Sequence, residues 1–208
     1  DILKRQLTQN VAHELKTPVA SIQGYLETIL DNEKIDEPTK KQFLERCYAQ
    51  SQRLTSLLHD ISTLNRLDDA STEMFDFEVV DISQMILDIQ KETALSLEKH
   101  EMLFNDNLPG NVQVKGNRSL LYSIFRNLTD NAISYAGEHT TITLDGKLQG
   151  DKWYFTFKDN GIGVPAAHIP RLFERFYRVD KGRSRKMGGT GLGLAIVKNA
   201  ILLHGGTI

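Results

Sequence analysis

A histidine near the start of the chain, His13, is followed directly by Glu14 and, four residues later, by Thr17. Imidazole is largely neutral and nucleophilic at pH 7, so it can accept a phosphoryl group on nitrogen. Glu14 could orient the ring or take its remaining proton, and Thr17 at i+4 shares the histidine's helix face. Pro18 removes one backbone hydrogen bond and is expected to bend the helix here. A solvated surface histidine is the alternative interpretation of His13 taken alone.

Two glycine clusters lie far downstream, in the segments Asp159–Asn–Gly161–Ile–Gly163 and Gly188–Gly–Thr–Gly191–Leu–Gly193. The first follows a predicted strand, where glycines allow a sharp turn and the carboxylate can accept a hydrogen bond from an adenine amino group. The second opens a predicted helix, whose free N–H groups and positive dipole end favour phosphate. It lacks the lysine of a Walker A loop and the glycine spacing of a dinucleotide fingerprint. A plain turn and a helix cap are the alternatives for each cluster alone.

A long helix predicted between the histidine and the glycine clusters carries Asn127 and Asn131. Projected at about 100° per residue, both amides flank an apolar face rather than oppose it. Half-buried amides need hydrogen-bond partners, which a Mg²⁺ ion with triphosphate oxygens would supply. Hydrogen bonds to neighbouring loops are the alternative.

A basic stretch with interleaved aromatic residues, Arg171–Lys186, separates the two glycine clusters. It can be interpreted as a nucleic-acid patch, as a solvated loop or as a lid that closes on ATP. We favour the lid, because the stretch leads directly to the helix that is predicted to bind phosphate.

The first third of the chain is predicted to position the histidine on a helical hairpin. Apolar residues recur every three or four positions over 3–29 and again, with coiled-coil spacing, over 43–64. A turn at 36–38 separates the two runs. The second stripe is widened by Leu44, Leu58 and Leu67. Two helices alone cannot bury so much, so we expect a second hairpin from another chain and a dimeric four-helix bundle. Packing against the rest of the chain is the alternative.

The helical period breaks at Asp68–Glu73, which marks a domain boundary, and an α+β order follows. Strands are predicted over 75–80, 100–105, 112–115, 140–148 and 153–158. Helices are predicted over 82–97, 117–136 and 190–203. Helices combined with a mostly antiparallel sheet favour a two-layer sandwich.

Composition excludes several classes of protein. The chain has 208 residues, a net charge of −2 and one cysteine, Cys47. This charge gives no general attraction to nucleic acid or to an anionic membrane, and one thiol can form neither an internal disulfide nor a thiolate zinc cluster. No run approaches the ~20 apolar residues of a membrane span. We expect a cytoplasmic fragment of a longer protein, which leaves room for a membrane anchor elsewhere.

Five segments together resemble the sensor histidine kinases of two-component systems. They are the phospho-acceptor box His13–Pro18, the asparagine box Asn127–Ala132, the first glycine box Asp159–Gly163, the phenylalanine box Phe173–Phe176 and the second glycine box Gly189–Gly193. The resemblance implies a dimerisation and histidine-phosphotransfer hairpin at 1–68, a linker at 69–76 and a catalytic ATP-binding domain at 77–208. It implies the Bergerat α/β sandwich fold for that domain, with its last β-hairpin missing. Many family members carry a lysine where this chain has Ser134.

The implied nucleotide-binding residues are Asn127, Asn131, Tyr135, Asp159, Gly161, Gly163, Arg175, Phe176, Arg178, Gly189, Thr190, Gly191, Leu192 and Gly193. Among them Asn131 would bind Mg²⁺, Tyr135 would pack on the adenine and Asp159 would contact its amino group. Arg175 or Arg178 would reach the γ-phosphate.

The implied function is ATP-dependent autophosphorylation of His13 and transfer of the phosphoryl group to an aspartate of a response regulator, with ATP and Mg²⁺ as cofactors. Glu14 would assist deprotonation of the histidine, and Thr17 would position water for dephosphorylating the regulator. The implied partners are a second copy bound through residues 1–68 and the receiver domain of the regulator, with no nucleic acid and no membrane contact. A net phosphatase and an ATP-binding scaffold without catalysis are the alternatives.

Overall fold

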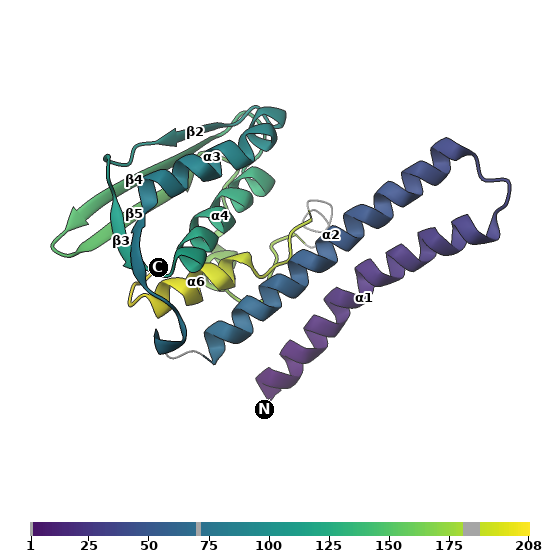
Figure 1. Cartoon of the computed structure of the whole chain (residues 1–208), viewed down its shortest axis with the longest axis horizontal. Helices are drawn as coiled ribbons and strands as arrows, with labels where there is room; N and C mark the ends of the chain where they lie inside the picture. Colours follow the sequence, from purple (N-terminus) through teal and green to yellow (C-terminus); the bar gives the residue numbers. More distant parts are fainter. Residues whose placement is uncertain (1, 70–71, 181–187) are drawn as a thin grey trace.

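The computed structural model describes residues 2–69, 72–180 and 188–208. Its first part is an antiparallel hairpin of two long helices, α1 (Ile2–Asp31) and α2 (Glu37–Asp68), as predicted (Figure 1). Asp36 caps α2 by accepting a hydrogen bond from the Thr39 N–H at 3.0 Å. Pro18 lies inside α1, which continues through it.

The second part alternates helices and strands in the order η1 (Thr72–Met74), β1 (Glu78–Asp81), α3 (Ile82–Lys99), β2 (Leu103–Asp106), β3 (Gln113–Gly116), α4 (Arg118–Tyr135), β4 (Thr141–Gln149), β5 (Lys152–Asp159), η2 (Ala166–Arg171) and α6 (Gly193–Leu203), where η denotes a 3₁₀ helix. All the predicted strands and helices are found, with ends shifted by up to three residues. Neither 3₁₀ helix was predicted.

The strands form two sheets, whereas the sequence suggested one. β1 pairs with β3 as an antiparallel ribbon, while β2, β4 and β5 form a separate sheet. In that sheet β4 runs parallel to β2 and antiparallel to β5. A parallel pair needs a long crossover connection, and here β3 and α4 lie within it. Local sequence signals locate strands but do not choose their neighbours, so this pairing was not anticipated.

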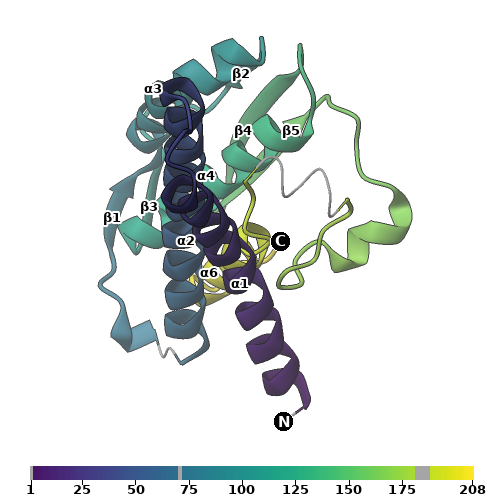
Figure 2. The ribbon, with the colours of Figure 1, turned by 90° about the vertical axis from the view of Figure 1, so that its right-hand side faces the viewer.

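Helices α3 and α4 pack on the three-stranded sheet, and α6 lies beside α4, which confirms the predicted two-layer sandwich (Figure 2). One core joins them and contains Ile86 of α3, Phe125 of α4, Leu144 of β4 and Val197 of α6. These side chains are all nearly or fully buried, so the sheet and the three helices share one hydrophobic core.

The start of α4 is hydrogen-bonded to the end of α6. Asn117 caps α4 by accepting from the Leu120 N–H at 3.0 Å. Its own backbone N–H donates to the Nε2 atom of His204, at the end of α6, at 3.0 Å. Because the start of α4 meets the end of α6, the start of α6 lies against the second half of α4. This arrangement brings the second glycine box to the asparagine box.

The sandwich rests on the hairpin through α6 (Figures 1 and 2). A buried cluster joins the two parts and contains Leu57, Leu64, Leu192, Ala195 and Ile196. Leu67 packs against the core of the sandwich, so it does not contribute to a dimer surface as the sequence suggested. Part of the widened stripe is therefore covered by the downstream domain.

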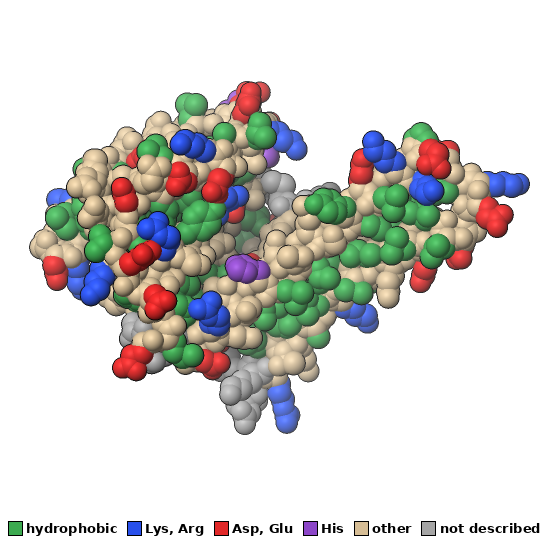
Figure 3. All heavy atoms as spheres, viewed as in Figure 1, with side chains coloured by type: hydrophobic (Ala, Val, Ile, Leu, Met, Phe, Trp, Pro, Cys, Tyr) green, Lys and Arg blue, Asp and Glu red, His purple; other side chains and the backbone are tan. Residues whose placement is uncertain are grey.

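Another apolar stripe of the hairpin remains exposed, and Figure 3 shows hydrophobic side chains gathered along this part of the molecule. The exposed fractions are 40% for Leu26, 45% for Leu44 and 52% for Leu58. Within the described residues, none of the helices has the length and hydrophobicity that crossing a bilayer requires.

Candidate active site

His13 lies on the exposed surface of α1, and its ring has no hydrogen-bond partner within the described residues. The Thr17 hydroxyl donates to the His13 backbone carbonyl at 3.3 Å, so the two residues share a turn as predicted. Glu14 points instead toward the second domain. Its side chain is 16% exposed, and its carboxylate lies 3.8 Å from Arg53 of α2 and 3.3 Å from Arg178.

The two asparagines of α4 have different surroundings. Asn127 donates from Nδ2 to the Ser123 carbonyl at 2.8 Å, and a Cβ atom on Gly193 would lie only 2.7 Å from its Oδ1. Asn131 is half-buried, and its amide makes no hydrogen bond to any residue in the described ranges. Buried amides are normally paired, so Asn131 is the asparagine that is left for a ligand. Tyr135, also half-buried, lies one turn further on.

The first glycine box closes onto the end of α4. Asp159 ends β5 and accepts the Gly161 N–H at 2.9 Å. The next N–H, of Ile162, donates to the Ala136 carbonyl at 3.1 Å. Because Ala136 follows Tyr135 directly, the structure brings Asp159 and Gly161 to the end of the helix that carries Tyr135. Gly163 has a φ of +73°, a conformation that favours glycine.

Substituting Gly161 with alanine is expected to destabilise the domain by about 2–3 kcal/mol. The new Cβ would lie 2.3 Å from the Ala136 carbonyl oxygen, and the bond from Ile162 holds both backbone segments in place. The thermal unfolding midpoint should fall by roughly 10 °C. Gly110→Ala is the matched control, because no atom lies within 4 Å of its added Cβ. Equal shifts in the two variants would rule out the clash as the cause.

The second glycine box opens α6. Gly191 has a φ of +76°, and its carbonyl accepts the Phe176 N–H at 2.8 Å. The Thr190 hydroxyl accepts the Leu192 N–H at 3.2 Å. No side chain of the described residues caps α6, so its first N–H groups lack a side-chain acceptor there; phosphate binding at this helix start stays a prediction. We call the segment Gly189–Gly193 the phosphate loop.

The residues of the phenylalanine box lie between this loop and the hairpin. Phe176, with a φ of +62°, packs against the buried cluster between the domains. Arg175 donates to Asp68 of α2 at 2.6 Å. Neither arrangement shows a nucleotide contact, so those two assignments stay predictions. The other basic residues of the predicted lid, at 181–186, lie outside the described residues.

Arg178 is almost completely buried, with 5% of its side chain exposed. One terminal nitrogen donates to the Gly189 carbonyl at 2.8 Å and to Glu14 at 3.3 Å. Its Nε has no partner within the described residues. A buried N–H without an acceptor costs about 1–3 kcal/mol, so this guanidinium lies beside the phosphate loop with unused capacity to donate.

Sequence reasoning missed three residues of α2 that contact this region, namely Arg53, Asp60 and Asp68. Asp60 accepts a hydrogen bond from the Thr190 hydroxyl at 2.7 Å. Burial raises the pKa of the Asp60 carboxyl, and the bond from Thr190 partly offsets that effect. The only signal in the sequence was that Asp60 shares a helix face with Leu57 and Leu64.

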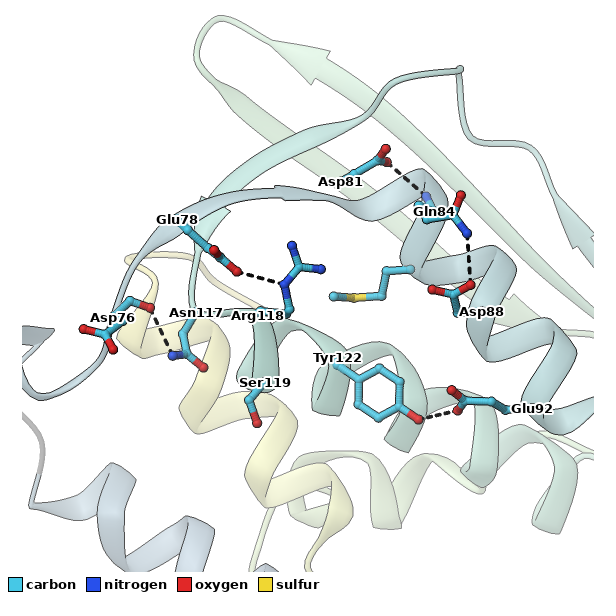
Figure 4. Close-up of a pocket in the computed structure, with 11 residues that line it drawn as sticks. Asp76, Glu78, Asp81, Gln84, Asp88, Glu92, Asn117, Arg118, Ser119 and Tyr122 are labelled. Carbon is cyan, nitrogen blue, oxygen red and sulfur yellow. Dashed lines mark hydrogen bonds and ion pairs between the residues drawn. The ribbon is translucent and has the colours of Figure 1, made fainter.

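A separate acidic groove of about 890 Å³ lies between β1, α3 and the start of α4 (Figure 4). Several of its carboxylates already have partners in the chain: Glu78 pairs with Arg118 at 2.8 Å, and Glu92 accepts from the Tyr122 hydroxyl at 2.5 Å. None of the predicted site residues lines it. The candidate site is therefore the region around the two glycine boxes and Asn131.

Two family models match the chain. The model of the "His Kinase A (phospho-acceptor) domain" matches residues 3–70, which include the hairpin. The model of the "Histidine kinase-, DNA gyrase B-, and HSP90-like ATPase" matches residues 116–208, which include α4 and both glycine boxes.

Individual proteins agree with these matches. The phosphate regulon sensor protein PhoR of Haemophilus influenzae is 40% identical over 204 residues, which are 97% of this chain and 46% of PhoR. The histidine kinase AdeS of Acinetobacter baumannii has a TM-score of 0.72 at 25% identity, over 92% of this chain and 86% of that one. The histidine kinase ThkA, solved in complex with the response regulator protein TrrA, shares the fold with a TM-score of 0.66 at 18% identity, over 83% and 50% of the two chains.

The chain spans about half the length of the curated relatives it matches. Within that span, the helical hairpin with its exposed histidine and the sandwich with its two glycine boxes correspond to the two matched family models. The chain therefore belongs to the sensor histidine kinase family and contains its phospho-acceptor hairpin and its ATPase domain.

Proposed function

We propose that this chain is the catalytic core of an ATP-dependent protein-histidine kinase that phosphorylates its own His13. The observation that carries the proposal is the contact between the phosphate loop and the helix turn of the histidine. Arg178 binds the Gly189 carbonyl of the loop and, 3.3 Å away, the carboxylate of Glu14. Two segments that are far apart in the sequence thus meet where a phosphate donor and a histidine acceptor would have to meet.

The residues of the site suggest how the reaction proceeds. The adenine would lie between Tyr135 and Asp159, with the phosphates at the start of α6. A ring nitrogen of His13 would attack the γ-phosphorus while the bond to the bridging oxygen of ADP breaks, and Glu14 would take the remaining ring proton. The amide oxygen of Asn131, which has no partner within the described residues, would hold Mg²⁺, and the bound ion would neutralise charge on the phosphates.

Incubation of the wild-type chain with γ-labelled ATP and Mg²⁺ tests this function. We expect the protein to gain a label that is lost in acid and stable in base, because phosphohistidine has this chemistry and phosphoserine does not. A chain that binds ATP but gains no such label would contradict the proposal and favour a scaffold or a phosphatase.

We propose a response-regulator receiver domain as the acceptor of the phosphoryl group. The relative ThkA was solved in complex with a response regulator, and the exposed position of His13 leaves its ring accessible to a second protein. Label that stays on the chain when receiver domains from the same organism are added would count against this step.

We also propose that residues 1–68 form a homodimer, with a linker at 69–76 and the ATP-binding domain at 77–208. Leu26, Leu44 and Leu58 stay 40–52% exposed although the downstream domain already covers another part of α2. A second hairpin would bury this stripe as a four-helix bundle. Sedimentation at the mass of a single chain, 23.5 kDa, would contradict the dimer.

A further inference from the structure

Within the described residues, three polar contacts connect the hairpin to the ATP-binding domain beside the buried cluster. We call them the clasp: Glu14 with Arg178 at 3.3 Å, Asp60 with Thr190 at 2.7 Å and Asp68 with Arg175 at 2.6 Å. In every pair the hairpin supplies a carboxylate and the ATP-binding domain supplies the hydrogen-bond donor.

Two of those donors belong to the phosphate-binding side of the candidate site. Thr190 lies within the phosphate loop, and Arg178 binds the carbonyl of Gly189 in the same loop. Carboxylates and phosphates are both anionic acceptors, and they take the same charged and polar donors. In this arrangement, hairpin carboxylates therefore occupy donors that phosphate groups would use.

The clasp also engages Glu14, the residue that would take the ring proton of His13 in the proposed function. Glu14 lies between the guanidinium groups of Arg53 and Arg178, at 3.8 and 3.3 Å. His13 is exposed, and its ring makes no hydrogen bond within the described residues. Because its carboxylate is engaged by these two guanidinium groups, we take the docked arrangement as the resting one.

Arg178 is only partly satisfied by the clasp. It is 5% exposed, yet its Nε has no hydrogen-bond partner within the described residues. Buried donors are normally paired, and each exception calls for an explanation. A ligand with several acceptor oxygens, such as a phosphate group, would satisfy Arg178 better than Glu14 does.

We propose that Glu14 and Asp60 compete with the phosphate groups of ATP for Arg178 and Thr190. They bind these two donors while the domains are docked, so ATP binding and docking oppose each other. This inference rests on the proposed function, because it takes the phosphate loop as the ATP site. Coupling of this kind is reciprocal: ATP loosens the docked domains, and loosening them strengthens ATP binding. When ATP draws Arg178 away, Glu14 becomes free to act on His13.

Asp60 is the better residue for testing this idea, since it has no part in the proposed chemistry. Its carboxylate lies 2.7 Å from the Thr190 hydroxyl of the phosphate loop, so a second anion placed at that hydroxyl would be repelled. Removing its charge should therefore favour phosphate binding even where the shape of the side chain is kept.

The test is the dissociation constant of a non-hydrolysable ATP analogue with Mg²⁺, measured by calorimetry on the whole chain. Asp60→Ala is expected to bind the analogue roughly two- to tenfold more tightly than the wild type, the range that one net hydrogen bond represents. Asp60→Asn keeps the shape of the side chain and one acceptor oxygen, so its affinity for the analogue should lie between those of the wild type and Asp60→Ala. It is the variant to measure if Asp60→Ala does not fold. Asp31→Asn, an exposed carboxylate at the end of α1, makes the same charge change away from the clasp and should leave the affinity unchanged.

Adenosine is the second probe, because it has no phosphates to compete with. Its affinity should be the same in all four proteins. The competition is refuted if both Asp60 variants bind the analogue no more tightly than the wild type, if adenosine gains as much affinity as the analogue, or if none of the proteins binds the analogue.

The outcome is independent of catalysis. A wild type that binds the analogue but never gains a phosphohistidine label would refute the proposed function and leave the competition standing. Normal labelling together with an unchanged affinity in both Asp60 variants would refute the competition alone.

Discussion

A chain with His13 replaced by glutamine is expected to gain no acid-labile label from γ-labelled ATP. Glutamine has no nucleophilic nitrogen, so the phosphoryl group has no acceptor. The fold should be unaffected because the His13 side chain is exposed and makes no side-chain hydrogen bond within the described residues. Surface substitutions of this kind usually change the free energy of unfolding by less than about 0.5 kcal/mol. Radiolabelling, with the thermal midpoint as a check on folding, measures both effects.

The matched control is His59→Gln on the second helix of the hairpin, where the side chain is also exposed. We expect it to keep the label, since His59 lies outside the phospho-acceptor box. If instead the His13 variant kept its label and the His59 variant lost it, the acceptor assigned from the sequence would be wrong.

Local signals explain why so much of the fold could be predicted. The hairpin follows from apolar spacing and from the turn that Asp36 caps. The start of α4 was predicted within one residue, because Asn117 is a typical N-cap and its side chain does accept the Leu120 N–H. The strands of the sandwich were located by alternation, which fixes which side chains face the core.

The contacts between the domains could not be predicted in this way. Glu14 and Arg178 are 164 residues apart in the sequence, and Asp60 and Thr190 are 130 apart. A charged residue on a helix is normally solvated, so the position of Asp60 on the helix face of Leu57 and Leu64 was not enough to predict its contact with Thr190. Asp60 is half-buried because α6 packs against α2 in the folded chain.

Motif matching had a different limit. The motif located the phenylalanine box but did not predict two contacts of Phe176. Its side chain packs between the domains, and its N–H donates to the Gly191 carbonyl. A motif indicates which residues belong together in a family and does not say which surface each one faces. For the same reason the assignment of Arg178 to the γ-phosphate did not suggest its present partner, Glu14.

The clasp and the buried cluster both include residues of the phosphate loop, Thr190 and Leu192. Leu192 is fully buried against the hairpin at the start of α6, and the phosphate loop is therefore held close to the histidine helix even at rest. In the proposed competition, docking keeps the phosphate loop near α1 while Glu14 and Asp60 occupy Arg178 and Thr190. Domain motion over a short distance would then be sufficient to change between the two arrangements.

Replacing Asn131 with alanine is expected to lower the rate of autophosphorylation at least about 100-fold, the loss that follows when one preorganised charge-stabilising group is removed. Among the predicted ligands, Asn131 is the half-buried amide that makes no hydrogen bond within the described residues. It is therefore free to hold Mg²⁺ together with the phosphates. Because the Asn131 side chain has no hydrogen-bond partner within the described residues, its replacement by alanine leaves no buried group without a hydrogen bond. Alanine also favours helix more than asparagine does. The thermal midpoint should therefore stay the same or rise slightly. Initial rates of label incorporation over a range of Mg²⁺ concentrations measure the effect.

Asn105→Ala is the control, because it makes the same chemical change at an exposed position of β2 and should leave the rate within about twofold of the wild type. Sedimentation of the Asn131 variant should match that of the wild type, because α4 lies in the sandwich and not in the hairpin. A smaller loss that disappears at high Mg²⁺ would assign Asn131 to metal affinity alone. A variant that keeps full activity at every Mg²⁺ concentration would remove Asn131 from the site and leave Asn127, which already bonds to Ser123 and lies against Gly193, as the remaining candidate on α4.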